Sequence, residues 1–270
     1  MILLSLQLFS QEEIKTNYDK KEVYIPMRDG VKLYTAIYTP KDISKKKKYP
    51  ILMQRTCYSI APYGEDNFKK SLGPNSSLED DKYIFVYQDV RGRYMSEGVF
   101  TNMTPQVEHK TKNDVDESTD TYDTVEWLVK NIKNNNGKVG QYGTSYPGFY
   151  SAAGTISNHP SLVASSPQAP ISDFFFDDFH HNGAFVMGYF RTFPVFGVQK
   201  TKAEKDAWYM SQFIRPTSDD GSIFFNELGT VKEATDKYYK DNFFMQEIIE
   251  HPNYDSFWQS RNLLPHLKNI

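Results

Sequence analysis

The sequence is poor in features that mark several common classes of protein. Its single cysteine, Cys57, excludes an internal disulfide and leaves the redox compartment undecided. Its 31 basic residues stand against 34 acidic ones, so it has no excess of positive charge to attract nucleic acid. The basic run at residues 45–48 is short and is typical of a solvated loop. With no internal repeat or low-complexity tract, the composition favours a soluble globular protein.

The N-terminal stretch at residues 2–9 is mostly apolar but too short to span a bilayer. It ends in polar residues, as a secretory signal does, although no basic residues precede its apolar part. We therefore predict that residues 1–11 are a signal-peptide remnant and that the protein is secreted or periplasmic. The alternatives are an ordinary first strand and a cytoplasmic protein.

The 270 residues are enough for one large α/β domain with an insertion, and strand and helix patterns alternate along the first part of the chain. Alternating apolar and polar residues predict a hairpin over residues 22–38, with its turn at MRDG, residues 27–30. Apolar runs predict buried strands at residues 49–55 and 83–90.

Apolar residues at helical spacing then predict a helix after the second buried strand. Asp120 is its expected N-cap, and the Asn- and Gly-rich residues 134–137 are its expected end. The next strand leads into Ser145, and another is expected at residues 162–169. The order strand, helix, strand predicts a parallel sheet with a right-handed crossover.

The stretch KVGQYGTSYPG, residues 138–148, is typical of a short strand, a sharp turn and a helix, with Ser145 at the turn. Gly143, two residues earlier, lets the backbone bend and lifts the serine hydroxyl clear of the sheet edge. Such a serine is a candidate nucleophile if a base takes its proton and hydrogen-bond donors are already in place to stabilise the oxyanion that forms on the substrate. One donor is the N–H of the next residue, Tyr146, and the other is expected from the loop at residues 55–58.

Three motifs in this order resemble one known family. They are RTCY at residues 55–58, DVRG with SEG within residues 89–98, and GTSYPG at residues 143–148. Over residues 22–270 the chain resembles the X-Pro dipeptidyl-peptidase superfamily of serine hydrolases, which also holds cocaine esterase, α-amino-acid ester hydrolases and glutaryl-cephalosporin acylases. The resemblance implies an acyl-enzyme on Ser145, with an oxyanion hole formed by the Tyr146 N–H and the Tyr58 hydroxyl.

The expected fold is an α/β-hydrolase fold, with a mostly parallel sheet and an inserted helical cap. Residues 12–170 form the first part of the core, and the aromatic, helical residues 171–264 form the cap. Residues 265–270 would begin another core strand, and the final strands would lie beyond Ile270.

The triad aspartate and histidine follow the cap in this family, so the resemblance places them beyond Ile270. Within the chain, Asp255 and His266 would complete the order Ser, Asp, His. This triad is less favoured, because both residues fall near the end of the cap rather than on loops at strand ends.

The predicted cap contains candidate residues for the substrate pocket. Asp177 and Asp178 could bind a substrate ammonium group, as acidic clusters do in relatives that hydrolyse α-amino acyl groups, but such a pair more often caps a helix or faces water. His180 and His181 could line the pocket. Phe185 belongs to an aromatic cluster that is either core or an acyl pocket. The histidine spacing compels no metal site, and no cofactor is expected.

Charged residues also follow the strand at residues 83–90. Asp89, Arg91 and Arg93 lie where open α/β sheets place their ligands. The alternative is that the three pair with one another and pin the loop.

The predicted function is hydrolysis of an ester or amide bond through an acyl-enzyme on Ser145, with a small-molecule or peptide substrate. One alternative is an X-Pro dipeptidyl-peptidase, which needs an acidic site for the free amine of its substrate. Another is a non-catalytic fragment or binding module that lacks the triad Asp and His. The sequence leaves an oligomer possible and predicts no membrane span.

Overall fold

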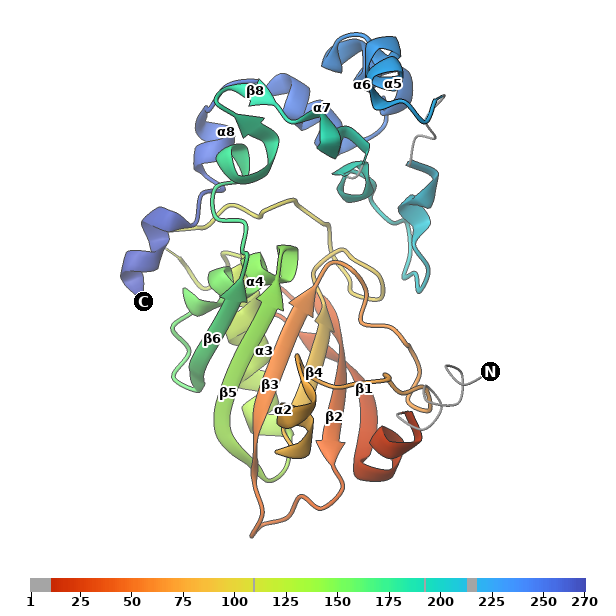
Figure 1. The fold of residues 1–270 in the computed structure, drawn as a ribbon. Coiled ribbons are helices and arrows are strands. Elements are labelled where there is room, and N and C mark those ends of the chain that lie inside the picture. Colours follow the sequence, from red (N-terminus) through yellow and green to blue (C-terminus); the bar gives the residue numbers. More distant parts are fainter. Residues whose placement is uncertain (1–10, 109, 192, 213–217) are drawn as a thin grey trace.

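A six-stranded sheet forms the base of the molecule (Figure 1). The computed structural model describes residues 11–270 except 109, 192 and 213–217, so the predicted signal remnant lies almost entirely outside the described residues. The strand order is β1-β2-β4-β3-β5-β6. The strands are β1 (Tyr18–Pro26), β2 (Lys32–Pro40), β3 (Tyr49–Thr56), β4 (Ile84–Asp89), β5 (Asn135–Thr144) and β6 (Leu162–Gln168).

The predicted hairpin is confirmed as β1 and β2, which pair antiparallel. Its turn closes where Gly30 N donates to Met27 O at 2.9 Å, and Gly30 has the positive φ of 87° that glycine adopts without strain. β2 also pairs antiparallel with β4, whereas β3, β4, β5 and β6 are parallel to one another. The predicted mostly parallel sheet is therefore confirmed, with an antiparallel hairpin at one edge.

The helices cover the two faces of the sheet unequally (Figure 1). α3 (Glu117–Asn131) and α4 (Tyr146–Thr155) pack side by side on one face, and α2 (Ser76–Asp80) lies on the other. Val125 and Leu128 of α3 are buried against strand residues such as Ile51 and Val86. β6 forms an edge of the sheet, and its Val163 side chain is 59% exposed.

The predicted N-cap of α3 at Asp120 is wrong. Asp116 caps the helix: its Oδ1 accepts from Thr119 N at 2.9 Å, and Thr119 Oγ1 accepts from Asp116 N at 2.8 Å. Asp120 lies buried in the first turn, where its carboxylate pairs with Arg91 at 2.7 Å. A distant arginine therefore decides the role of Asp120, which local spacing could not show. The helix also ends earlier than predicted, at Asn131.

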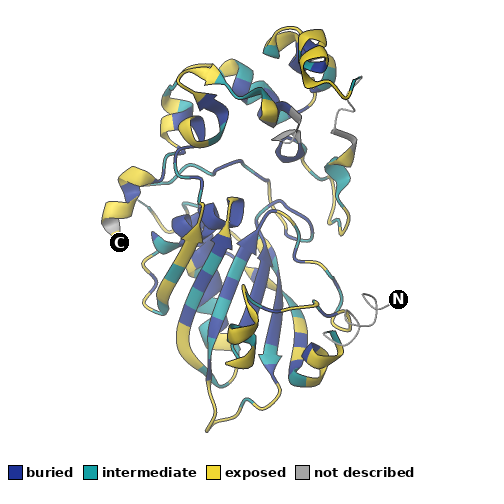
Figure 2. Cartoon of the chain, in the orientation of Figure 1, coloured by how far each residue is buried: buried dark blue, intermediate teal, exposed yellow. Residues whose placement is uncertain are grey.

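Residues 171–270 form a C-terminal segment above the carboxyl ends of the parallel strands (Figure 1). One apolar cluster joins it to the sheet, because Phe174 and Trp258 belong to the same buried core as Phe149 of α4. Figure 2 shows buried residues both on α4 and within the segment. Its elements are η1 (Phe175–Phe179), β7 (His180–His181), β8 (Ala184–Phe185), η2 (Met187–Arg191), η3 (Phe193–Phe196), η4 (Trp208–Gln212), α5 (Gly221–Leu228), α6 (Val231–Tyr238), α7 (Phe243–Glu250), α8 (Ser256–Gln259) and η5 (Leu264–Asn269).

Two features of this segment differ from the prediction. β7 and β8 form a small antiparallel hairpin within a region expected to be helical. The strand expected at residues 265–270 is instead the 3₁₀-helix η5, which suits Pro265 because proline fits the first turn of a helix. None of the described helices is long and apolar enough to cross a membrane.

The capping box of α3 gives a prediction for stability. We expect Asp116→Ala to lower the free energy of unfolding by about 1–2 kcal/mol, because Thr119 N loses its partner. Asp116→Asn should cost less, because asparagine caps helices about as well as aspartate. Urea unfolding of the three proteins measures both changes. Equal losses in the two variants would show that the second carboxylate oxygen, which pairs with Lys110 and accepts from Val107 N, each at 3.1 Å, carries the effect instead.

Candidate active site

Ser145 occupies a tight turn between β5 and α4. Its backbone has φ 63° and ψ −127°, a conformation that residues with side chains rarely adopt. Two hydrogen bonds hold it there: Ser145 N donates to Gln168 O on β6 at 3.0 Å, and Ser145 O accepts from Phe149 N at 3.0 Å. The serine is exposed at the carboxyl edge of the sheet.

Glycines on either side of Ser145 let the backbones approach closely. A Cβ added at Gly143 would lie 2.1 Å from Pro147 O, and one at Gly148 would lie 2.6 Å from Gln168 O. Both distances are far below any real contact, and the obstructing atoms belong to the backbone, which cannot rotate away. Only glycine therefore fits at these two positions of the GTSYPG motif without moving the backbone.

Tyr146 begins α4, so its backbone N–H has no preceding helical turn to bond. Its ring is buried, and its hydroxyl accepts from Met103 N at 2.8 Å and donates to Asn102 Oδ1 at 3.3 Å. Asn102 is itself buried and tied to the C-terminal segment. Its Nδ2 donates to Phe196 O at 2.9 Å, and its carbonyl accepts from Arg261 Nε at 3.2 Å.

Tyr58, on the loop after β3, reaches the serine. The Ser145 side chain lies near enough to the Tyr58 hydroxyl to lower the pKa of that phenol. The Tyr58 ring meets the Tyr146 ring edge-on with centroids 6.4 Å apart and lies 6.0 Å from the Phe196 ring. Desolvation raises the pKa of Tyr58, and the nearby Ser145 side chain opposes this only in part. The phenol therefore stays protonated at neutral pH and can donate. The structure brings Ser145, Tyr146 and Tyr58 together.

The two adjacent aspartates have different surroundings. Asp177 Oδ2 accepts from Ser172 N at 2.7 Å and from Asp173 N at 2.9 Å, so it holds the backbone that enters η1. Asp178 is half-buried and close enough to Tyr58 for its negative charge to raise the pKa of that phenol. Of the pair, Asp178 is the one whose charge affects Tyr58.

The other candidates from the predicted cap lie within the C-terminal segment. His180 is buried and stacks on Phe175 with centroids 3.9 Å apart, and burial lowers its pKa, so it is neutral. His181 is exposed. Phe185 is half-buried and stacks on Phe179 at 6.2 Å, so it packs with the core of this segment.

The residues of the less favoured triad have partners other than Ser145. Asp255 pairs with His251 at 2.7 Å and caps α8 through Phe257 N at 3.0 Å. His266 lies in η5, with its Nδ1 3.9 Å from Glu108. The structure thus places Asp255 and His266 in separate interactions.

The charged residues after β4 do not pair with one another as the alternative supposed. Arg91 bridges Asp29 and Asp120, each at 2.7 Å. Asp89 and Arg93 instead contact the loop that carries Tyr58, as described below. Sequence reasoning missed this role, and it also missed Asn102, because no local spacing signals a contact between residues so far apart in the chain.

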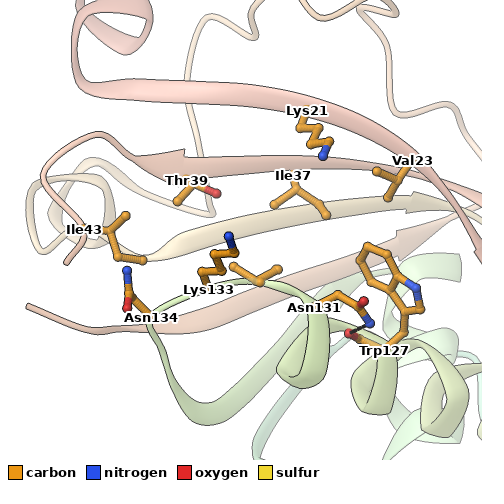
Figure 3. A pocket seen from close by; sticks show the side chains of 10 residues that line it. Lys21, Val23, Ile37, Thr39, Ile43, Trp127, Asn131, Lys133 and Asn134 are labelled. Atoms are coloured by element: carbon orange, nitrogen blue, oxygen red, sulfur yellow. Dashed lines mark hydrogen bonds between the residues drawn. The ribbon is translucent and has the colours of Figure 1, made fainter. Parts of the chain in front are cut away.

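A separate cavity of about 330 Å³ opens between the β1–β2 hairpin and the end of α3 (Figure 3). Val23, Ile37 and Trp127 give it apolar walls, and Lys21 and Lys133 add amino groups. It lies at the amino ends of the parallel strands, whereas Ser145 lies at their carboxyl ends. It is therefore not a pocket for a group bound to Ser145.

Residues 29–270 match the family described as X-Pro dipeptidyl-peptidase, the S15 family. The chain belongs to this family. This S15 chain is 27% identical over 265 residues to the cocaine esterase of Rhodococcus sp. (strain MB1 Bresler). The aligned residues cover 92% of this chain and 41% of that esterase. The resemblance carried by the three motifs is confirmed.

Solved structures of similar proteins have the same fold. An α-amino acid ester hydrolase labelled with selenomethionine is 34% identical to the S15 chain, with a TM-score of 0.78 over 93% of this chain and 40% of that one. An aminopeptidase from a marine sediment archaeon, Thaumarchaeota archaeon, is 34% identical, with a TM-score of 0.77 over 92% and 40% of the two chains. The predicted α/β-hydrolase fold class is confirmed. The chain spans about two fifths of the length of these relatives.

The buried carboxyl of Asp89 gives a prediction for pH. Burial raises its pKa to about 7, although Tyr63 and nearby N–H groups donate to it. An unfolded aspartate has a pKa of about 3.9, so between about pH 4 and pH 7 the folded protein binds the extra proton and loses stability as pH rises. We expect this group to lower the free energy of unfolding by about 2 kcal/mol from pH 5 to pH 7.

Urea unfolding at the two pH values, with Asp89→Asn as the comparison, measures this contribution. In the variant, the free energy of unfolding should fall by about 2 kcal/mol less from pH 5 to pH 7, because asparagine does not titrate. The same change in both proteins would assign the pH dependence to other groups.

Proposed function

We propose that this S15-family protein is a serine hydrolase that cleaves an ester or amide bond through an acyl-enzyme on Ser145. The observation that carries the proposal is the strained turn that exposes Ser145 between Tyr146 and Tyr58, whose rings lie 6.4 Å apart. A neutral phenol and the free N–H of Tyr146 are two donors next to one nucleophile. That arrangement supports an oxyanion hole.

The steps follow from these positions. A base takes the proton from Ser145 Oγ, and the oxygen attacks the substrate carbonyl carbon. The carbonyl oxygen becomes an anion that Tyr146 N–H and Tyr58 Oη–H stabilise. The leaving group then departs with the proton, and water repeats the sequence to release the acid. We propose, from the family resemblance, that the base and its carboxylate partner follow Ile270 in the whole protein.

For the substrate, we propose an acyl group that carries a free α-amino group. Asp178 supports this class because its carboxylate is near enough to Tyr58 for its negative charge to raise the pKa of that phenol. A carboxylate near the oxyanion donors can attract a substrate ammonium. Two similar proteins are named an α-amino acid ester hydrolase and an aminopeptidase, which favours the same class. An X-Pro dipeptidyl-peptidase would use the same acidic group, so it remains the second candidate.

A fluorophosphonate probe tests the nucleophile in the protein expressed with the residues that follow Ile270 in its reading frame. We expect the wild type to be labelled and Ser145→Ala to remain unlabelled. Tyr58→Phe should lower kcat for a p-nitrophenyl ester by about 10²-fold, because one oxyanion donor is lost. Equal labelling of Ser145→Ala would assign the nucleophile elsewhere. A wild type that is neither labelled nor active would favour the binding module.

The substrate class is tested with an α-amino acid p-nitrophenyl ester and its N-acetylated counterpart. Asp178→Asn should lower kcat/KM about 10-fold or more for the free amine, because a charge-assisted contact is lost, and about 2-fold at most for the acetylated ester. Asp177→Asn is the matched control and should affect both esters equally. Equal losses for both esters in Asp178→Asn would contradict the ammonium site.

A further inference from the structure

The turn that carries Tyr58 is held on both sides of that residue by side chains from the end of β4. Before Tyr58, Cys57 O accepts from Arg93 Nε at 3.2 Å. After Tyr58, Ile60 N donates to Asp89 Oδ1 at 3.0 Å. The backbone of residues 57–60 is thus fixed at two points by one short segment of the chain.

A third contact reaches the same turn through Tyr63. Asp89 Oδ2 accepts from the Tyr63 hydroxyl at 2.9 Å, and that hydroxyl lies 3.0 Å from Ser59 Oγ. Ser59 has a positive φ of 87°, which costs free energy in a residue with a side chain. The turn needs such anchors because its own conformation is strained.

The anchoring groups are buried ionisable side chains, whose charged forms are costly unless they are well paired. Asp89 and Arg93 are both 0% exposed. The Arg93 guanidinium lies 4.5 Å from the Trp208 ring and 4.9 Å from the Phe100 ring, and its Nη1 donates to Val195 O at 3.2 Å. Arg93 therefore links the turn to the C-terminal segment as well as to β4.

Tyr58 itself is 46% exposed, so packing alone does not fix its side chain. The place of its hydroxyl depends on where the backbone of residues 57–60 lies. We propose that Asp89 and Arg93 are positioning residues that hold this turn so that the Tyr58 hydroxyl stays at Ser145. The inference rests on the proposed function, in which Tyr58 is an oxyanion donor. Displacement of a catalytic group by about 1 Å can cost about 10²-fold in rate, so the anchors have a measurable effect.

A double-mutant cycle in the protein expressed beyond Ile270 tests the proposal, with kcat and KM measured on a p-nitrophenyl ester. Asp89→Asn keeps the size of the side chain but cannot accept from both Ile60 N and Tyr63. We expect it to lower kcat about 10-fold with KM changed by less than about 2-fold. Combined with Tyr58→Phe, it should lower kcat no further than Tyr58→Phe alone, because the donor that it positions is already absent.

Arg91→Lys is the matched control, because Arg91 belongs to the same segment but faces Asp29 and Asp120. It should leave kcat unchanged. If Asp89→Asn does not fold, Tyr63→Phe replaces it in the cycle, because it removes only the hydroxyl that joins Asp89 to Ser59. The same loss of additivity is then expected.

The outcomes separate the two proposals. If Tyr58→Phe keeps the wild-type kcat, the oxyanion role of Tyr58 fails, and the positioning role fails with it. If Tyr58→Phe lowers kcat but Asp89→Asn lowers it further by the same factor in the double variant, only the positioning role is overturned. The same holds if Asp89→Asn alone keeps the wild-type kcat.

Discussion

The close crossing of α4 over the end of β5 is the constraint on which the site depends. The two backbones leave no space for a side chain at Gly143, where a Cβ would lie 2.1 Å from Pro147 O. Between this glycine-dependent approach and the one at Gly148, Ser145 has a positive φ of 63°, and the residue is exposed at the edge of the sheet. The same crossing makes Tyr146 the first residue of a helix, with an unbonded N–H beside the serine.

The site is also tied to the C-terminal segment by buried polar groups. Asn102 bonds the Tyr146 hydroxyl on one side and Phe196 O and Arg261 Nε on the other. A buried amide without partners costs about 1–3 kcal/mol, so this residue favours the arrangement in which the segment is in place. Arg93 makes a similar link from the Tyr58 turn to Val195. The geometry around Ser145 is therefore a property of both parts of the chain.

Local patterns predicted the features that local physics decides. The turn at residues 27–30 and the turn at Ser145 both depend on glycines, and strand and helix periodicity predicted the mostly parallel sheet around them. Long-range contacts decided the rest. Asp120 pairs with a distant arginine instead of capping α3, and nothing in the sequence separates Asp177 from Asp178, which face different surroundings. Ser145 and Tyr146 were predicted from the pattern of strand, turn and helix, and Tyr58 from the family resemblance, whereas the side chains that hold them were not predicted.

The burial of Cys57 has a practical consequence for labelling. Burial raises the pKa of this thiol to about 12, and the side chain is 0% exposed. Thiolate is the form that reacts with alkylating reagents, so the folded chain is inert to them at neutral pH. Because residues 1–270 contain no other cysteine, one introduced on their surface would be the single reactive thiol within these residues. Spectroscopic labels can therefore be attached to this protein without first replacing a residue next to Tyr58.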